Sequence, residues 1–454
     1  MKFRELPSVD KVLSNNNIKL LLDKYSRDWI TSIIRVVLQE ARIDISNGLK
    51  PRTLEQIVQS ITEKVIDLVC VGPMKVINAT GVIIHTNLGR SPLSKDALDA
   101  MVNSGEGYSD LEFDIERGKR GSRDRHSLDL LKYLTGAESG LIVNNNAAAM
   151  LLGLTVFAAG KNVVISRSES VEIGGGFRVP DVIEQSGVKI KEVGTTNRTF
   201  IKDYERGIDE QTVAIVKIHP SNFKVMGFTS SPDLSELVEF AHKRELLVMH
   251  DIGSGCLFDV TRFGLAYEPL PIDSVKAGVD LVFFSGDKLL GGPQSGIIVG
   301  KKNLINSMAS HPMARALRMD KTRLAALHAT LNHYIKGDAL EKIPIWRMIT
   351  ATGIDIKKRA MRWKNIIGDI ATVKSAYSTI GGGSLPGETL ETWVVAINCS
   401  GFKGGAEALS YRLRIQDPSV LARIEQEQIL LDPRTVDKDE EDVLISAVKD
   451  VTNG

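Results

Sequence analysis

The first part of the chain carries apolar residues at a helical spacing. Between residues 18 and 41 they recur every four positions, which predicts one amphipathic helix with the stripe Leu21, Tyr25, Trp29, Ile33 and Val37. A second helix is predicted after Pro51, where Thr53 and Gln56 form a capping box ahead of the stripe Ile57, Ile61, Val65 and Leu68. Residues 1–70 are therefore predicted to form a small helical domain, which ends at the break Val71-Gly72-Pro73.

From about residue 75 to 310, short β-rich runs alternate with helical stretches. These runs cover residues 141–143, 163–166, 188–193, 213–218, 246–249, 281–284 and 296–299. Such alternation favours an α/β domain with a mainly parallel seven-stranded sheet, whose ligands bind at the carboxyl ends of the strands. We assign residues 71–335 to this large domain.

The remaining residues, 336–454, mix strands such as 393–398 and 429–431 with helices. We expect a smaller C-terminal α/β domain there. The stretch Gly381-Gly382-Gly383-Ser384 predicts a flexible loop within it.

Composition narrows the range of environments. The 454 residues carry a net charge of +1, so a nucleic-acid partner would have to bind a local basic patch. The three cysteines, Cys70, Cys256 and Cys399, are too few and too widely spaced for a disulfide framework or a zinc cluster, and no metal site is expected. The N-terminus lacks a signal-peptide core, and the longest nearly apolar run, residues 147–160, is too short to span a bilayer. We expect a soluble, cytoplasmic protein.

The strongest chemical signal is Lys288, which lies in a glycine-rich turn directly after the apolar run 281–284. A lysine in a turn is usually a solvated surface residue, but here a second strand end changes the interpretation. The run 246–249 leads into Asp251, which offers a carboxylate to a pyridinium nitrogen. A lysine that forms a Schiff base and an aspartate that keeps a ring nitrogen protonated are the two requirements of a pyridoxal 5'-phosphate (PLP) site. We therefore predict Lys288 and Asp251 as catalytic residues.

Further residues are predicted to bind this cofactor. Asn145, Asn146 and Ala147 begin a helix after the first strand, where backbone N–H groups can receive a phosphate. The alternative for this turn is an ordinary Asn-capped helix. Ser285, three residues before Lys288, can add a hydroxyl to the phosphate site, and Gly253 follows Asp251 at its strand end.

Several arginines are candidates for binding an oxyanion. Arg90 follows a glycine ahead of the first strand, and Arg315 and Arg318 would share one face if their segment were helical. Guanidinium groups suit phosphate, although a solvated helix face also explains an Arg-x-x-Arg pair. Arg123 belongs to a dense basic run, which is either a surface loop or a segment that reaches an active site, including that of a neighbouring subunit.

The motifs together resemble those of the bacterial selenocysteine synthases, from about residue 75 to the C-terminus. The matching segments are residues 77–81, 85–90, 118–123, 143–147, 172–175, 193–197, 251–255, 285–294 and 315–318. The resemblance implies a PLP-dependent enzyme of the aspartate-aminotransferase fold, fold type I. Such enzymes convert L-seryl-tRNA(Sec) to L-selenocysteinyl-tRNA(Sec) through an aminoacrylyl-tRNA intermediate, with selenophosphate as the selenium donor.

The resemblance also implies roles for other parts of the chain. Residues 1–70 match the family in position and length, and would bind the tRNA. The family forms large ring-shaped homo-oligomers, which implies a ring of dimers and a decamer here. Arg90, Arg315 and Arg318 would bind the phosphate of selenophosphate.

Two other functions stay open from the sequence. A PLP-dependent lyase acting on a free or phosphorylated amino acid could use the same core, although it would not need the helical domain. A tRNA-binding protein with an inactive PLP fold is disfavoured, because Lys288, Asp251 and the asparagine turn are all present.

Overall fold

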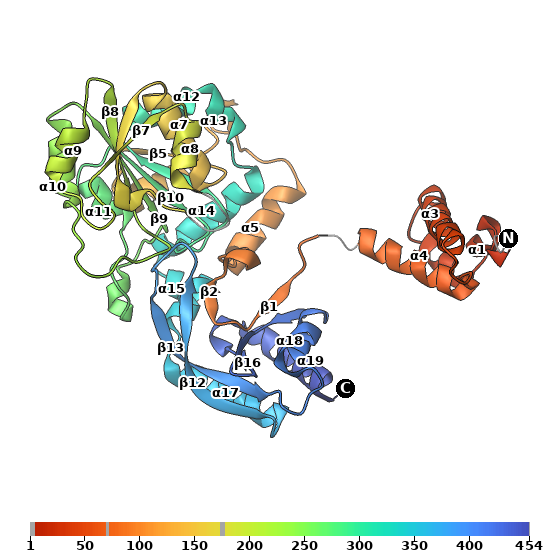
Figure 1. Ribbon diagram of the computed structural model, residues 1–454. Coiled ribbons are helices and arrows are strands. Elements are labelled where there is room, and N and C mark those ends of the chain that lie inside the picture. The colour runs from red at the N-terminus through yellow and green to blue at the C-terminus, as the bar shows by residue number, and fades with distance from the viewer. Residues whose placement is uncertain (1–4, 70–71, 173–177, 454) are drawn as a thin grey trace. The chain divides into compact units, whose positions relative to one another are not determined.

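The computed structural model describes residues 5–69, 72–172 and 178–453. Its contacts divide the chain into two compact units, Met1–Lys75 and Val76–Gly454, labelled by element in Figure 1. Cys70, Val71 and all but the first residue of the motif 172–175 lie outside the described residues. Among the helices that are described, none is both long and apolar enough to cross a membrane.

Residues 5–69 form a small helical unit. Its helices are α1 (Val9–Leu13), α2 (Asn16–Leu22), α3 (Arg27–Ser46) and α4 (Leu54–Val69). The prediction of one helix over 18–41 is wrong, because α2 ends at Leu22 and α3 begins after Ser26, whose Oγ accepts a hydrogen bond from the Trp29 N–H at 3.4 Å. Serine favours this capping position over a helix interior. The apolar residues keep their four-residue spacing across this break. Tyr25, within the break, packs edge-on against Trp29 of α3, with ring centroids 5.4 Å apart.

The start of α4 agrees with the sequence. The Thr53 N–H donates to Gln56 Oε1 at 2.9 Å, and the Gln56 N–H donates to Thr53 Oγ1 at 3.3 Å, so the predicted capping box is confirmed. The first three members of the predicted stripe, Ile57, Ile61 and Val65, are buried, whereas Leu68 is exposed. The apolar face of α4 therefore ends one turn earlier than predicted.

The second unit contains a seven-stranded sheet. In spatial order its strands are β5 (Ser139–Val143), β11 (Gly296–Gly300), β10 (Leu281–Ser285), β9 (Leu247–Gly253), β8 (Thr212–Ile218), β6 (Asn162–Ser166) and β7 (Lys189–Val193). β11 runs antiparallel to both neighbours, and the other neighbouring strands are parallel. Each strand corresponds to one predicted run, so the mainly parallel seven-stranded sheet is confirmed.

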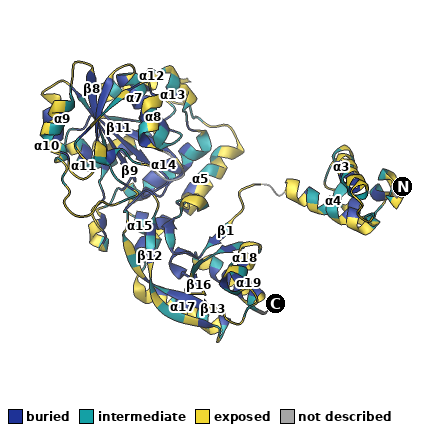
Figure 2. Ribbon diagram, viewed as in Figure 1, coloured by how far each residue is buried: buried dark blue, intermediate teal, exposed yellow. Residues whose placement is uncertain are grey.

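Both faces of this sheet are covered by helices, and its central strands are buried along their length (Figure 2). Val282 and Phe284 of β10 share one apolar cluster with residues of α6 (Arg125–Thr135), α10 (Leu234–His242) and α14 (Lys321–Lys336). Leu281 and Phe283 share the opposite cluster with residues of α7 (Asn146–Ala158), α8 (Val179–Gln185) and α12 (Lys302–Ser310). This two-sided burial explains why the strands are nearly continuous apolar runs.

A second sheet combines segments from both ends of the unit. Its order is β15 (Arg423–Glu425), β16 (Gln428–Leu431), β13 (Thr389–Asn398), β12 (Ala371–Gly381) and β2 (Val82–Ile84). β2 runs parallel to β12, with Val82 opposite Thr379 and Ile84 opposite Gly381. β1 (Val76–Asn78) likewise pairs with β14 (Ser419–Leu421). Residues 76–84 thus lie with the C-terminal sheet, although sequence order grouped them with the large domain.

The turn between β1 and β2 is anchored by buried polar groups. The Asp432 N–H donates to the Ala79 carbonyl at 2.9 Å, and the Gly81 N–H donates to Thr435 Oγ1 at 3.1 Å. Gly81 has φ +77°, and a Cβ there would lie 2.3 Å from Asp432 Oδ2. The positive φ and the close approach of Asp432 therefore explain why position 81 of the motif 77–81 is a glycine.

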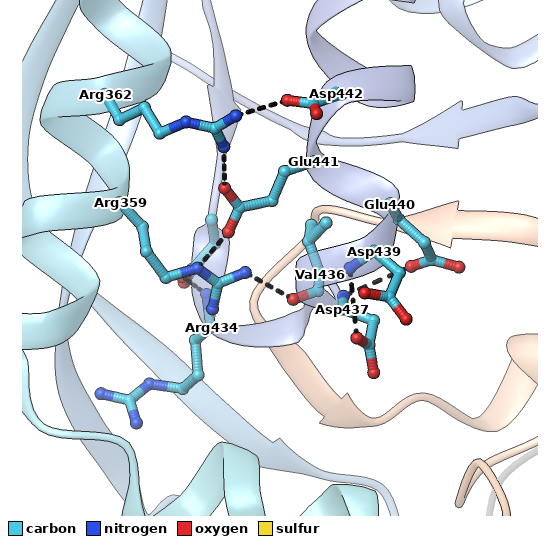
Figure 3. A network of polar contacts seen from close by, with 10 residues as sticks. Arg359, Arg362, Arg434, Val436, Asp437, Asp439, Glu440, Glu441 and Asp442 are labelled. Atoms are coloured by element: carbon cyan, nitrogen blue, oxygen red, sulfur yellow. Dashed lines mark hydrogen bonds and ion pairs between the residues drawn. The ribbon is translucent and has the colours of Figure 1, made fainter. Parts of the chain in front are cut away.

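Two helices over the second sheet are joined by the ion pairs in Figure 3. Arg359 and Arg362 of α17 (Gly353–Ile367) both pair with Glu441 at the start of α19 (Glu441–Asn453), and Arg362 also pairs with Asp442 at 2.5 Å. Glu441 is 4% exposed, so the two guanidinium groups neutralise a buried carboxylate. These arginines stabilise the helix pair.

Candidate active site

Lys288 lies just beyond β10 and is only 7% exposed. Burial lowers the pKa of its amine below the ordinary lysine value, the charge of Asp251 opposes this shift, and Arg90 adds to it. A lowered pKa increases the share of neutral amine, which is the form that attacks an aldehyde. The position is therefore suited to a lysine that binds a carbonyl cofactor.

Asp251 lies near the end of β9, the strand next to β10. Its Oδ1 accepts hydrogen bonds from Asn146 Nδ2 at 2.8 Å and from the Gly253 N–H at 3.0 Å. Burial raises the pKa of this carboxyl, and the bond from Asn146 counteracts part of the shift. Because both bonds use Oδ1, Oδ2 can accept from a further donor such as a protonated ring nitrogen.

The start of α7 supplies backbone donors. Asn145 is the N-cap, and its Oδ1 accepts from the Ala148 N–H at 2.9 Å, as in the ordinary capped helix that the sequence left as an alternative. The side chain of Asn146 contacts Asp251, and Ala147 keeps the first turn uncluttered. These side chains thus hold the helix and the carboxylate, while the backbone N–H groups of the first turn remain suited to a phosphate.

Gly253 and Ser285 complete the strand ends. Gly253 has φ +68°, and a Cβ there would lie 3.4 Å from Ser221 Oγ and 3.7 Å from Lys288 Nζ. Ser285 ends β10 and is 6% exposed. The structure thus brings Gly253, Lys288 and Ser221 together, and Ser221 is a neighbour of the site that no sequence motif marks.

Arg90 lies on residues 85–91, the arm that follows β2, and its side chain contacts the turn that carries Lys288. Its Nη1 lies 2.7 Å from Asp287 Oδ2, and its backbone has φ +65°, which is strained for a residue other than glycine. The next residue, Ser91, donates from Oγ to the Lys288 carbonyl at 2.6 Å. The predicted substrate residue Arg90 is therefore adjacent to the predicted catalytic lysine.

Arg315 and Arg318 do not share a helix face. Arg315 is exposed on α13 (Pro312–Ala316), which ends before Arg318. The backbone of Arg318 pairs with Val143 instead, and its Nη1 lies 3.5 Å from Glu112 Oε1. The two arginines would share a face only if their segment were helical, and it is not helical as far as Arg318. Arg318 instead lies beside β5, the strand that leads into α7.

The basic run contacts Glu112, an acidic residue that no sequence motif marks. Arg123 pairs with Glu112 at 2.9 Å and donates from Nη1 to the Met319 carbonyl at 2.9 Å, while Arg120 also pairs with Glu112. Burial alone would raise the pKa of Glu112, but the hydrogen bonds from Arg123 and Arg120 outweigh it and lower the pKa. In this chain Arg123 therefore serves an intrachain contact.

The buried polar atoms around Lys288 and Asp251 show whether the site can hold PLP, because a bound polar group would pair with those that have no partner in the protein. Several buried side-chain atoms on segments that border Asp251, Lys288 or Gly383 have no hydrogen-bond partner in the part of the chain that the structure describes; they are His85 Nδ1, Asn146 Oδ1, His219 Nε2, Ser254 Oγ, Glu268 Oε1 and Ser384 Oγ. Buried polar atoms are normally paired, so a cluster of unpaired ones indicates a polar ligand. PLP carries a ring nitrogen, a phenolic oxygen and a phosphate, which can satisfy such groups.

A buried lysine and a buried aspartate at adjacent strand ends of this sheet define the class of PLP-dependent enzymes of fold type I. A family model described as L-seryl-tRNA selenium transferase matches residues 76–437, and one described as selenocysteine synthase N terminal matches residues 3–42. The chain belongs to the L-seryl-tRNA selenium transferase family.

Relatives support this membership over the whole chain. The chain is 44% identical over 447 residues to the L-seryl-tRNA(Sec) selenium transferase of Carboxydothermus hydrogenoformans, covering 97% of this chain and 95% of that protein. It is 42% identical over 461 residues to that of Alkaliphilus oremlandii, covering 99% and 98%. The predicted resemblance to this family is confirmed.

A solved structure of a D-glucosaminate-6-phosphate ammonia-lyase is similar with a TM-score of 0.61 and 21% identity, covering 86% of this chain and 98% of that one. At this identity the similarity shows the fold alone, and it agrees with the predicted fold type I.

Proposed function

We propose that this chain converts L-seryl-tRNA(Sec) to L-selenocysteinyl-tRNA(Sec), with PLP as cofactor and selenophosphate as selenium donor. The observation that carries the proposal is the similarity over 97% of the chain to a protein of that name, combined with the buried Lys288 and Asp251 at neighbouring strand ends. The reaction is a β-replacement, in which the seryl hydroxyl leaves as water, selenium from selenophosphate bonds to Cβ, and water cleaves the Se–P bond to release phosphate.

When bound, PLP supplies an electron sink for the electrons of the substrate Cα–H bond. Lys288 would hold the cofactor through Nζ, and this nitrogen, when it is not bonded to the cofactor, would accept the Cα proton of the seryl group. Asp251, oriented by Asn146, would keep the ring nitrogen protonated through Oδ2. Burial of both groups excludes water, which strengthens their interaction.

Arg90, Arg315 and Arg318 are proposed to bind the phosphate of selenophosphate. Arg90 is the best supported, because it lies beside the lysine turn through its pair with Asp287. A phosphate would then share this guanidinium with the Asp287 carboxylate, which a group with five N–H donors allows.

Residues 1–70 are proposed to bind the body of the tRNA by shape and backbone charge. The helical unit offers the exposed basic residues Lys19, Lys24, Arg27, Arg35, Arg42 and Lys50. Arg52, another candidate, pairs with Asp44 at 2.6 Å and has a structural role within the unit. Holding the tRNA body would raise the effective concentration of the seryl end at Lys288.

Deleting residues 1–70 tests this assignment. The shortened protein should still bind PLP, yet its affinity for seryl-tRNA(Sec) should fall, and binding by the full chain should weaken steeply with salt. Conversion of seryl-tRNA(Sec) at the full-length rate by the shortened protein would instead make the unit a structural appendage.

The second candidate, a PLP-dependent lyase acting on a free or phosphorylated amino acid, is less well supported. The match of residues 3–42 to the selenocysteine synthase N-terminal family favours the tRNA substrate. We also propose a homo-oligomer, a ring of dimers and a decamer by resemblance, acting in the cytoplasm. Light scattering on the purified protein would test the oligomer.

The direct test is to incubate the purified chain with PLP, seryl-tRNA(Sec) and selenophosphate, and to identify the aminoacyl product by mass spectrometry. We expect selenocysteinyl-tRNA(Sec), and none from the same mixture without selenophosphate. Release of pyruvate and ammonia from free serine or phosphoserine, without a tRNA product, would support the lyase.

A further inference from the structure

The glycine-rich loop between β12 and β13 touches the candidate catalytic lysine. Gly383 has φ +80°, and a Cβ there would lie 2.7 Å from Lys288 Nζ and 2.8 Å from Lys288 Cε. Gly381 and Gly382 are equally crowded, because a Cβ would lie 2.3 Å from the Ile84 carbonyl and 2.4 Å from Thr86 Oγ1. The loop backbone therefore lies where only glycine fits.

Two carboxylates fasten the end of this loop to residues 266–268, which precede α11 (Pro271–Lys276). The Leu385 N–H donates to Glu268 Oε2 at 3.4 Å, at the long end of the hydrogen-bond range. In the opposite direction, the Ala266 N–H donates to Glu388 Oε2 at 2.9 Å. Each segment thus supplies one N–H and one carboxylate, and we call these four residues the clasp.

Burying the Glu268 carboxylate for this contact costs free energy of folding. Glu268 is 1% exposed, and its Oε1 has no hydrogen-bond partner among the described residues. A buried carboxylate with an unpaired oxygen costs stability, so its presence indicates a role beyond holding the fold. Leu385 is similarly strained, with φ +47° in a buried position.

The clasp is continuous with the rest of the site. Glu268 Oε2 lies 3.4 Å from His219 Nε2, and the His219 N–H donates to the Asp251 carbonyl at 2.8 Å. Burial is the largest cause of the lowered pKa of Lys288, and Glu268 is among the carboxylates whose charge opposes it. Glu268 is thus connected both to the loop over Lys288 and to the charge on its nitrogen.

We propose that Glu268 is a positioning residue: its carboxylate holds the glycine-rich loop closed over Lys288, and its negative charge stabilises a positive charge on the lysine nitrogen. The proposal rests on the proposed function in so far as that function gives Lys288 its role with PLP. It predicts two effects: the carboxylate slows opening of the loop, and its charge raises the pKa of the lysine nitrogen. Glu268→Ala tests the first effect, and Glu268→Gln tests the second.

The first experiment is hydrogen–deuterium exchange on the full-length protein without tRNA. Glu268→Gln keeps an oxygen for the Leu385 N–H, whereas Glu268→Ala removes it. In Glu268→Ala, residues 381–388 should exchange about tenfold faster, because a buried charge-assisted hydrogen bond is lost. Glu268→Gln should remain close to the wild type, and Glu391→Gln, an exposed glutamate on β13, is the control that should change nothing.

The second experiment titrates the visible absorption of bound PLP with pH. In Glu268→Gln the midpoint should move to lower pH, because a negative charge that favours the protonated nitrogen is lost. A purely structural carboxylate would leave this midpoint unchanged. If Glu268→Ala does not fold, Glu388→Ala removes the other bond of the clasp and should accelerate exchange in the same segment.

Unchanged exchange in Glu268→Ala would overturn the positioning of the loop, and an unchanged midpoint in Glu268→Gln would overturn the electrostatic part. Neither measurement uses tRNA or selenophosphate, so a failed selenium-transfer assay would refute the proposed function without touching this inference. Absence of PLP on Lys288 in the wild type would refute the proposed function and the electrostatic part of this inference, while the exchange measurement would still decide the positioning of the loop.

Discussion

The two larger sheets of the second unit draw on the chain in different ways. The strands of the seven-stranded sheet all come from residues 139–300, and the helices that cover them come from the same segment and its flanks, residues 125–336. The five-stranded sheet takes one strand from residues 82–84 and the others from residues 371–431. The first sheet supplies Asp251 and Lys288, whereas the second brings Gly383 and the arm carrying Arg90. Local sequence pattern thus encodes the predicted catalytic residues, and long-range strand pairing encloses them.

Replacing Lys288 should have the largest effect on activity, because it removes the amine that the seven-stranded sheet positions for the cofactor. Lys288→Ala should lower the rate of product formation by at least roughly 10²–10⁴-fold, the usual cost of losing a positioned acid–base group. Borohydride reduction of the wild type with PLP, followed by peptide mapping, should label Lys288. Lys302→Ala, an exposed lysine after β11, is the control and should retain activity. A label on another lysine would contradict the assignment.

Gly383→Ala tests the contribution of the second sheet at the same atom. The new methyl group would collide with Lys288 Nζ, so PLP affinity should fall about tenfold, which corresponds to the lower end of the strain expected for such a site. Gly387→Ala is a matched control, because Gly387 has φ +75° but open space around its Cβ position. Titration of each variant with PLP measures the difference. Equal losses in both variants would show that backbone strain, and not contact with the lysine, is responsible.

The arginines sharpen the comparison, because Arg90 follows a strand of the second sheet and Arg318 pairs with a strand of the first. Arg90→Ala and Arg318→Ala should each lower kcat/KM for selenophosphate about tenfold, as expected for losing a charge-assisted hydrogen bond, and keep the PLP absorption. Arg315→Ala tests the exposed member in the same assay. Arg117→Ala, with a side chain that is 72% exposed, is the control. An arginine whose loss abolishes PLP binding belongs to the cofactor site instead.

The smallest expected effect is on stability alone. Gly81→Ala would place a methyl group against Asp432 at a backbone with φ +77°, and should lower the free energy of unfolding by about 1–3 kcal/mol. Gly264→Ala shares the positive φ without a neighbour within 4 Å, and should lose less. Thermal unfolding of the two variants measures the difference. An equal loss would mean that Asp432 adapts to the methyl group.

The comparison also explains which features the sequence could predict. Lys288 and Asp251 are predictable from the sequence because each lies within four residues of the end of an apolar run, so the signal is local. The break at Ser26 was missed because the apolar spacing continues across it, and the contact between Asn146 and Asp251 because it joins different strand ends. Glu268 has no sequence signal, and the glycine run predicts only a loop at Gly383, because the roles of both residues arise from contacts between segments about 95 to 117 residues apart. The roles of the arginines stay predictions.

The pairing of β2 with β12 has a consequence for how the protein matures. Val82 and Thr379 are about 300 residues apart along the chain, so joining them costs more loop-closure entropy than any pairing within the seven-stranded sheet. During synthesis the N-terminal strand must wait until nearly the whole chain has emerged from the ribosome. Lys288 therefore belongs to a part of the molecule that can form early, and the strands that enclose it can pair only later. A translation product truncated before β12 would carry Lys288 without this enclosure, and we expect it to be inactive for that reason.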